Sequence, residues 1–152
     1  MIKIKENQEL NVSNLLSYRG KVRQLELESI GKEMENYIHK AGAKRVGNPI
    51  TATYAIEGDA IDVELLMPID MIINSKDNFV FKSQIKIVNA VVAAYKGHPI
   101  GLQDACNQLN QYIVEHKLQP ITVGYNVTKK TDMLNPDNTE IDVYVGISTN
   151  IL

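Results

Sequence analysis

The sequence of 152 residues contains one cysteine and no tryptophan. A single cysteine, Cys106, excludes an internal disulfide and a metal site built from several cysteines. No apolar run is long enough to span a bilayer, and the beginning, MIKIKENQEL, lacks the apolar stretch of a secretory signal. The sequence therefore predicts a cytoplasmic protein that does not bind a membrane.

An excess of charge of one sign is also missing, because 16 basic residues stand against 18 acidic ones and the net charge is −2. No strong positive field attracts phosphate polymers, so direct binding of nucleic acid is not expected. The content of 44% hydrophobic and 22% charged residues is typical of a folded globular protein. Length favours one domain over residues 1–152.

The chain contains an internal repeat, and its halves cover about residues 8–69 and 84–148. Between them, residues 70–82 read as an exposed turn. Each half contains the same short motifs in the same order. The four pairs are Tyr18-Arg19-Gly20 with Tyr95-Lys96-Gly97, Tyr37-Ile38 with Tyr112-Ile113, Pro49–Tyr54 with Pro120–Tyr125, and Ile61-Asp62-Val63 with Ile141-Asp142-Val143.

Periodicity predicts the elements of each half. The first motif pair closes an apolar-rich segment and indicates a strand that ends at a glycine turn, at Gly20 and at Gly97. Spacings of three and four predict one helix per half, and alternation predicts two strands after each helix. The helical stripes are Ile30, Met34, Tyr37, Ile38 and Ala41, then Leu102, Cys106, Leu109, Tyr112 and Ile113; the hairpins are 50–56 with 61–66 and 121–128 with 141–147.

These elements predict an α+β fold of duplicated β-α-β-β modules related by a pseudo-twofold axis, with an antiparallel sheet and two helices on one of its faces. Such an axis is expected to create a groove. Strand parity places Ile50, Ala52, Tyr54 and Tyr125 toward the helices, with Ile56 and Ile121 on the same side, and places Glu64, Asn126 and Tyr144 on the opposite face. That polar face is either simply solvated or lines the groove, where Gly124 and Gly146 leave space.

On these motifs the sequence resembles the effector-binding domains of bacterial transcription activators, also called gyrase-inhibitor-like domains. The similarity covers about residues 8–147. It includes Tyr95-Lys96-Gly97-His98-Pro99-Ile100, which looks like the glycine-proline turn of that family, and Thr139-Glu140-Ile141-Asp142-Val143, which looks like its closing strand.

The resemblance implies a cleft that binds small, often cationic or aromatic, organic molecules with tyrosines and a buried glutamate on the penultimate strand. At that glutamate position this sequence has Asn126. An amide offers only hydrogen bonds, so cation binding is expected to be weak unless Glu64 supplies the charge, and Asn126→Glu is expected to strengthen it. The predicted ligand-binding residues are Glu64, Tyr95, Asn126 and Tyr144.

No catalytic or metal-binding constellation is predicted, and no cofactor. His39 and His116 lie at the ends of the helical stripes, where an imidazolium interacts favourably with the helix dipole. Cys106 lies in an apolar stripe, where it acts as a small hydrophobic residue.

Three functions remain open. The first is a stand-alone small-molecule-binding domain without a DNA-binding segment of its own, because almost every residue is assigned to the duplicated fold. The second is a protein-interaction or inhibitor module that uses the polar face or the second hairpin, where Lys129, Lys130, Met133 and Leu134 mix charge with apolar surface. The third is a small hydrolase, which the loss of the family's glutamate argues against.

Overall fold

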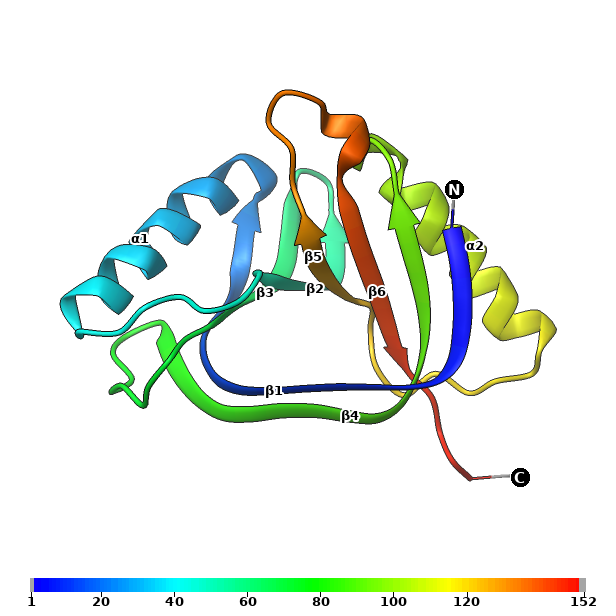
Figure 1. Cartoon of the computed structure of the whole chain (residues 1–152), viewed down its shortest axis with the longest axis horizontal. Coiled ribbons are helices and arrows are strands. Elements are labelled where there is room, and N and C mark those ends of the chain that lie inside the picture. The colour runs from blue at the N-terminus through cyan, green and yellow to red at the C-terminus, as the bar shows by residue number, and fades with distance from the viewer. Residues whose placement is uncertain (1, 151–152) are drawn as a thin grey trace. The chain divides into compact units, whose positions relative to one another are not determined.

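A computed structural model describes residues 2–150. Among these residues it has six strands and two α-helices, with short 3₁₀ turns before each helix and in the last hairpin (Figure 1). None of the helices within 2–150 has the length and apolar character needed to cross a membrane. The elements are β1 (Ile2–Arg23), α1 (Leu27–Lys40), β2 (Ile50–Glu57), β3 (Ala60–Pro68), β4 (Phe79–Lys96), α2 (Leu102–Glu115), β5 (Tyr125–Lys130) and β6 (Glu140–Gly146).

The chain divides into two compact units. The α1 unit is formed by residues 11–85, and the α2 unit by the described part of residues 1–10 and 86–152. Each unit contains a helix, a hairpin and parts of the long strands β1 and β4, and all strand pairs within the units are antiparallel. The predicted α+β class and the duplicated strand-helix-strand-strand order are therefore confirmed.

In the α1 unit, β3 pairs with β1 on one side and with β2 on the other. Met34 and Ile38 of α1 are buried against Leu16 of β1 and Met67 of β3. Figure 1 shows α1 beside the last part of β1. The predicted apolar stripe of this helix is thus the stripe that packs, although Ala41 at its end is exposed.

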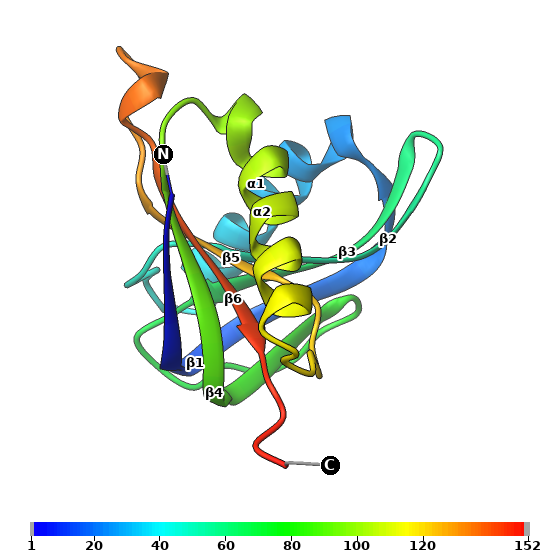
Figure 2. The same ribbon diagram turned by 90° about the vertical axis from the view of Figure 1, so that its right-hand side faces the viewer.

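In the α2 unit, β6 pairs with β4 and β5. Leu109 and Ile113 of α2 are buried against Val91 of β4 and against Val143 and Val145 of β6, and Figure 2 shows α2 running along these strands. Because Leu102, Cys106 and Tyr112 pack against the same cluster, the second predicted stripe is also confirmed.

Backbone hydrogen bonds show which positions of the two units are equivalent. The N–H of Ile69 donates to the carbonyl of Asn14, and the N–H of Ile147 donates to the carbonyl of Asn89. The first strands and the helices of the two units are therefore offset by 75 residues (89 − 14, and 102 − 27 for the helix starts), and the last strands by 78 (147 − 69). In the sequence, the tyrosine-glycine motifs are offset by 77 residues and the last motif pair by 80. Each of these offsets exceeds the structural offset of its strands by two residues, so the paired motifs do not occupy equivalent positions in the two units. Glu64 corresponds to Asp142, and Leu66 corresponds to Tyr144.

Several predicted boundaries are wrong. Gly20 lies inside β1, opposite Val63, and is not a turn, whereas Gly97 follows the end of β4 as predicted. The last hairpin begins at Tyr125, so residues 121–124 are not part of the strand. Residues 79–82 belong to β4 and not to an exposed linker. Ile56 and Ile121 are exposed, although strand parity placed them in the core.

The two helix faces generate a stability prediction. Leu109→Ala is expected to lower the free energy of unfolding by about 2–5 kcal/mol, because it leaves a cavity in a cluster that is almost fully buried. Val114→Ala, on the exposed side of the same helix, is expected to change it by less than about 0.5 kcal/mol. Urea denaturation compares the two variants, and equal unfolding midpoints would contradict the assigned helix faces.

Candidate functional site

One acidic side chain of the α1 unit is buried. Glu64 lies in the middle of β3 and is only 4% exposed. Its neighbours across the strands are Arg19 on β1 and Ala52 on β2. A buried ionised carboxylate is costly unless charged and hydrogen-bonding partners surround it, so its partners decide what this part of the fold can do.

Both carboxylate oxygens of Glu64 have partners. The Lys82 ammonium and the Ser17 hydroxyl each donate to Oε2 at 2.6 Å. The Tyr54 hydroxyl donates to Oε1 at 3.3 Å. These donors come from β4, β1 and β2, so three strands meet at one carboxylate. We call Ser17, Tyr54, Glu64 and Lys82 the Glu64 cluster.

A second cation covers the tyrosine of this cluster. The Arg19 guanidinium carbon lies 3.5 Å from the centre of the Tyr54 ring, which is a cation-π contact. The same guanidinium makes two hydrogen bonds of 3.0 Å to the carboxylate of Asp62. This bidentate pair fixes the plane of the guanidinium over the ring.

The partners of Glu64 also set its pKa. Burial is the largest single influence and raises the pKa, but the hydrogen bonds from Lys82 and Ser17 and the charge of Lys82 together lower it below the usual 4.5. A carboxyl group whose pKa is lowered in the folded state stabilises the fold above its unfolded pKa. That contribution is lost as the pH falls through the lowered value.

The position of Tyr54 corrects the predicted strand faces. Residues opposite each other in an antiparallel pair share a face, and Ile50 and Ala52 lie opposite Leu66 and Glu64. They therefore lie on the Glu64 face and not on the helix face. The alternation of apolar and polar residues along β2 is compatible with either face, and only the register between the strands shows which residues lie on the Glu64 face. The register shifts between Thr53 and Ala55, and Tyr54, at this irregularity, reaches the Glu64 carboxylate.

The strand register also decides on which face of the sheet each predicted site residue of the α2 unit lies. Tyr125 lies opposite Tyr144, and Val92 of β4 is the other neighbour of Tyr144, so these three share one face. Asn126 lies opposite Val143, which packs against α2. The prediction that Asn126 and Tyr144 share a face is therefore wrong, whereas the expectation that Asn126→Glu strengthens cation binding stays a prediction.

An acid-lysine pair also occurs in the α2 unit. Asp142, the structural equivalent of Glu64, lies 3.6 Å from the Lys129 ammonium. Tyr144 lies two residues away. Burial, and then the charge of Asp142, raises the pKa of the Tyr144 phenol, so this hydroxyl stays protonated at neutral pH and can donate a hydrogen bond.

Tyr95 closes a turn. Its hydroxyl donates to the carbonyl of His98 at 2.5 Å, and its ring lies against Gly97 and Gly101. A Cβ at Gly97 would come within 2.8 Å of this hydroxyl, so the turn after β4 requires glycine there. The hydroxyl of this predicted ligand-binding residue is thus used in the turn before α2.

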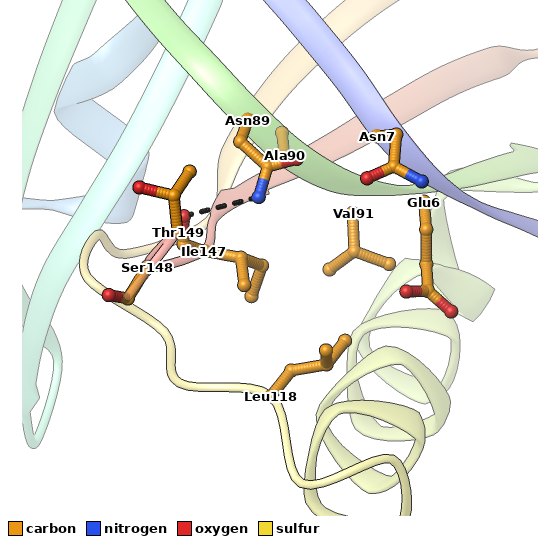
Figure 3. Close-up of a pocket in the computed structure, with 9 residues that line it drawn as sticks. All are labelled: Glu6, Asn7, Asn89, Ala90, Val91, Leu118, Ile147, Ser148 and Thr149. Atoms are coloured by element: carbon orange, nitrogen blue, oxygen red, sulfur yellow. Dashed lines mark hydrogen bonds between the residues drawn. The ribbon is translucent and has the colours of Figure 1, made fainter. Parts of the chain in front are cut away.

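A hollow of about 450 Å³ lies in the α2 unit (Figure 3). Val91, Leu118 and Ile147 form its apolar part, while Asn7 and Asn89 supply polar groups. None of the four predicted site residues lines it. Its volume is that of a small-molecule site, but the α1 unit has a hollow of about 490 Å³ beside α1, so volume does not single it out.

Two other kinds of reactive group are the metal-binding side chains and the thiol of Cys106. No group of three metal-binding side chains occurs among residues 2–150. Burial raises the pKa of the Cys106 thiol, which disfavours the thiolate.

Sequence reasoning identified Glu64 but missed three of its neighbours. Lys82 lies in the segment predicted as a linker, Ser17 carries no motif, and Tyr54 was predicted to lie in the core. A pattern of local periodicity contains no signal for partners that come from three different strands.

Comparisons with known proteins identify the fold. No family model matches the chain, and no curated protein sequence matches it significantly. The chain is similar to the C-terminal domain of EcmrR, with a TM-score of 0.79 and 16% identity over 99% of this chain and 98% of that domain. In a complex of EcmrR with DNA, the match spans 58% of the EcmrR chain, with a TM-score of 0.76 and 17% identity.

Two further solved structures are similar over almost the whole chain. A hydrolase from Listeria innocua has a TM-score of 0.60 and 12% identity over 97% of this chain and 91% of its own. The protein SAV2435, bound to tetraphenylphosphonium, has a TM-score of 0.55 and 8% identity over 98% of this chain and 94% of its own. At these identities the similarity shows the fold alone, and the shared fold agrees with the α+β fold that the sequence predicts.

The Glu64 cluster generates a double-mutant prediction. Lys82→Met is expected to lower the free energy of unfolding at pH 7 by about 1–3 kcal/mol, because it leaves a buried carboxylate without a counter-ion. The cost stays below that of a fully buried pair because the Lys82 side chain is 39% exposed. Adding Glu64→Gln is expected to recover part of the loss. Strictly additive effects in urea denaturation would show that the two charges are not coupled.

Proposed function

We propose that this chain is a small-molecule-binding module of the effector-binding type and that the Glu64 cluster forms part of its ligand site. The buried carboxylate is the observation that supports this proposal most directly. A core position on a central strand ordinarily holds an apolar residue. Burying a charged group there costs free energy even when the group is paired, and a function in recognition is a reason to keep it. Groups from three strands, β1, β2 and β4, hold this carboxylate and cover Tyr54.

The chemistry of the cluster indicates the kind of ligand. Tyr54 offers a ring and a hydroxyl, and Lys82 offers ammonium donors from a side chain that is 39% exposed. These groups suit an organic molecule with an aromatic surface and a hydrogen-bonding group. SAV2435, which is similar in fold, has been solved with the bulky aromatic ion tetraphenylphosphonium.

Three predicted residues of the α2 unit remain candidates for ligand binding. Tyr144 is the strongest, because Tyr125 and Val92 extend its face into an apolar and aromatic row. Asn126 and Tyr95 are weaker, since one lies opposite Val143 and the other uses its hydroxyl within a turn. A cytoplasmic location and the lack of direct nucleic-acid binding stay predictions from the sequence.

A hydrolytic function has less support. A general base acts best when its pKa lies near the working pH. The lowered pKa of the Glu64 carboxyl makes it a weak base, and Lys82 and Ser17 both occupy Oε2. The similarity in fold to a Listeria innocua hydrolase supplies no residue that changes this conclusion.

Protein interaction is the second candidate function, and the loop between β5 and β6 favours it. Met133 and Leu134 are 96% and 98% exposed. The loop that presents them is ordered by Asp132, whose carboxylate accepts hydrogen bonds from the backbone N–H groups of Leu134 and Asn135 and from the Asn138 amide. Two apolar side chains held in this way suit a small contact with another protein.

A dye titration separates the two functions. Nile red and 8-anilinonaphthalene-1-sulfonate provide a neutral and an anionic aromatic probe whose fluorescence reports binding. At least one is expected to bind the native protein, and Tyr54→Ala is expected to weaken that binding by about tenfold or more, because it removes the ring and the hydroxyl that the cluster offers to an aromatic molecule. Tyr144→Ala tests the second candidate residue in the same assay.

Met133→Ser/Leu134→Ser is the matched control, since it changes exposed side chains outside the Glu64 cluster. It is expected to leave both dye binding and the urea midpoint unchanged. If neither dye binds the native protein, or if the loop variant alone abolishes binding, the small-molecule proposal fails and the protein-interaction candidate takes its place.

A further inference from the structure

The charges around Glu64 already balance. Arg19 and Lys82 are cations, Asp62 and Glu64 are anions, and each cation bonds to one of the anions. The α1 unit therefore presents no uncompensated negative charge at this cluster. An external cation that came close to Glu64 would have to displace a lysine that lies 2.6 Å from the carboxylate.

The aromatic ring of the Glu64 cluster is also in contact with a cation of the chain. A binding site for an organic cation needs a desolvated carboxylate and an open aromatic face. Here the Arg19 guanidinium lies over one face of the Tyr54 ring, and the Lys82 ammonium bonds to Oε2 of Glu64. Both features that would recognise an organic cation are thus in contact with cations of the chain itself.

A tethered cation competes strongly with a free one. Lys82 is covalently part of β4, so its ammonium is present at a high effective concentration that no dilute ligand can match. Displacing it would also leave Lys82 without its partner. An anionic or neutral acceptor does not meet this competition, because an ammonium group has three donors and can bind Glu64 and a second acceptor together.

We propose that Lys82 and Arg19 are resident cations, Lys82 on the Glu64 carboxylate and Arg19 on the Tyr54 ring, so that the native protein binds neutral or anionic aromatic molecules and excludes organic cations. This inference rests on the proposed ligand-binding function and specifies the charge of its ligand. Lys82 is then a specificity-determining residue, and its removal converts the cluster into a site for cations.

Titration with tetraphenylphosphonium tests the inference. The native protein is expected to bind it weakly, and Lys82→Met at least tenfold more tightly, because the substitution leaves the Glu64 carboxylate unpaired. The gain is expected to disappear in Lys82→Met/Glu64→Gln. Lys86→Met, which removes an exposed lysine from the same strand, is the matched control for net charge and is expected to bind like the native protein.

A second measurement addresses the case in which Lys82→Met folds poorly. Lys82→Ala removes three methylene groups and the ammonium, which together correspond to propylammonium. Propylammonium chloride is expected to raise the Tm of Lys82→Ala more than that of the native protein, whereas 1-propanol or sodium chloride at equal concentration is not. Equal effects on both proteins would overturn the assignment of Lys82 as a resident cation.

The outcomes separate this inference from the proposed function. If the native protein binds tetraphenylphosphonium as tightly as Lys82→Met, or if the gain survives Glu64→Gln, the inference fails while a ligand site remains. The inference also fails if the neutral or anionic dye binds but no variant binds the cation. If no probe of any charge binds any variant, both the inference and the proposed function fail.

Discussion

The ion pair between Glu64 and Lys82 is the interaction on which the candidate site depends. A carboxylate that is 4% exposed stays ionised only if nearby groups offset the loss of water. Lys82, Ser17 and Tyr54 do so here, and they come from three strands. The pairing of β3 with β1 and β2, and the irregularity at Thr53 and Ala55, therefore have a direct consequence for the chemistry of the site.

Duplication produced two similar frameworks that hold different chemistry. The ladders of the two units match element by element, with Glu64 equivalent to Asp142 and Leu66 equivalent to Tyr144. Each unit pairs its acid with a lysine, but the α1 pair has a buried carboxylate and is short at 2.6 Å, whereas the α2 pair is looser at 3.6 Å. The α1 unit thus contains the short ion pair between Lys82 and Glu64, and the α2 unit contains the tyrosine pair Tyr125 and Tyr144.

Much of the fold could be predicted from the sequence because it depends on local periodicity. The stripes that contain Met34 and Leu109 identify both helices and their buried faces. The side of each hairpin strand could not be predicted, because alternation leaves two choices and only the pairing of Ala52 with Glu64 and of Asn126 with Val143 selects one. Lys82 was missed for a related reason: its partner is 18 residues away, on a different strand.

The protonation state of the Glu64 carboxyl in the native protein shows whether Lys82 holds this group in its charged form. Its side-chain carboxyl carbon can be followed by NMR as a function of pH, in the native protein and in Lys82→Met. The native titration midpoint is expected to lie below 4.5 and the midpoint in Lys82→Met to be shifted upward, because burial, the largest influence on this pKa, is then opposed by fewer partners. A native midpoint above 4.5, or one that Lys82→Met leaves unchanged, would contradict the claim that Lys82 holds Glu64 in its charged form.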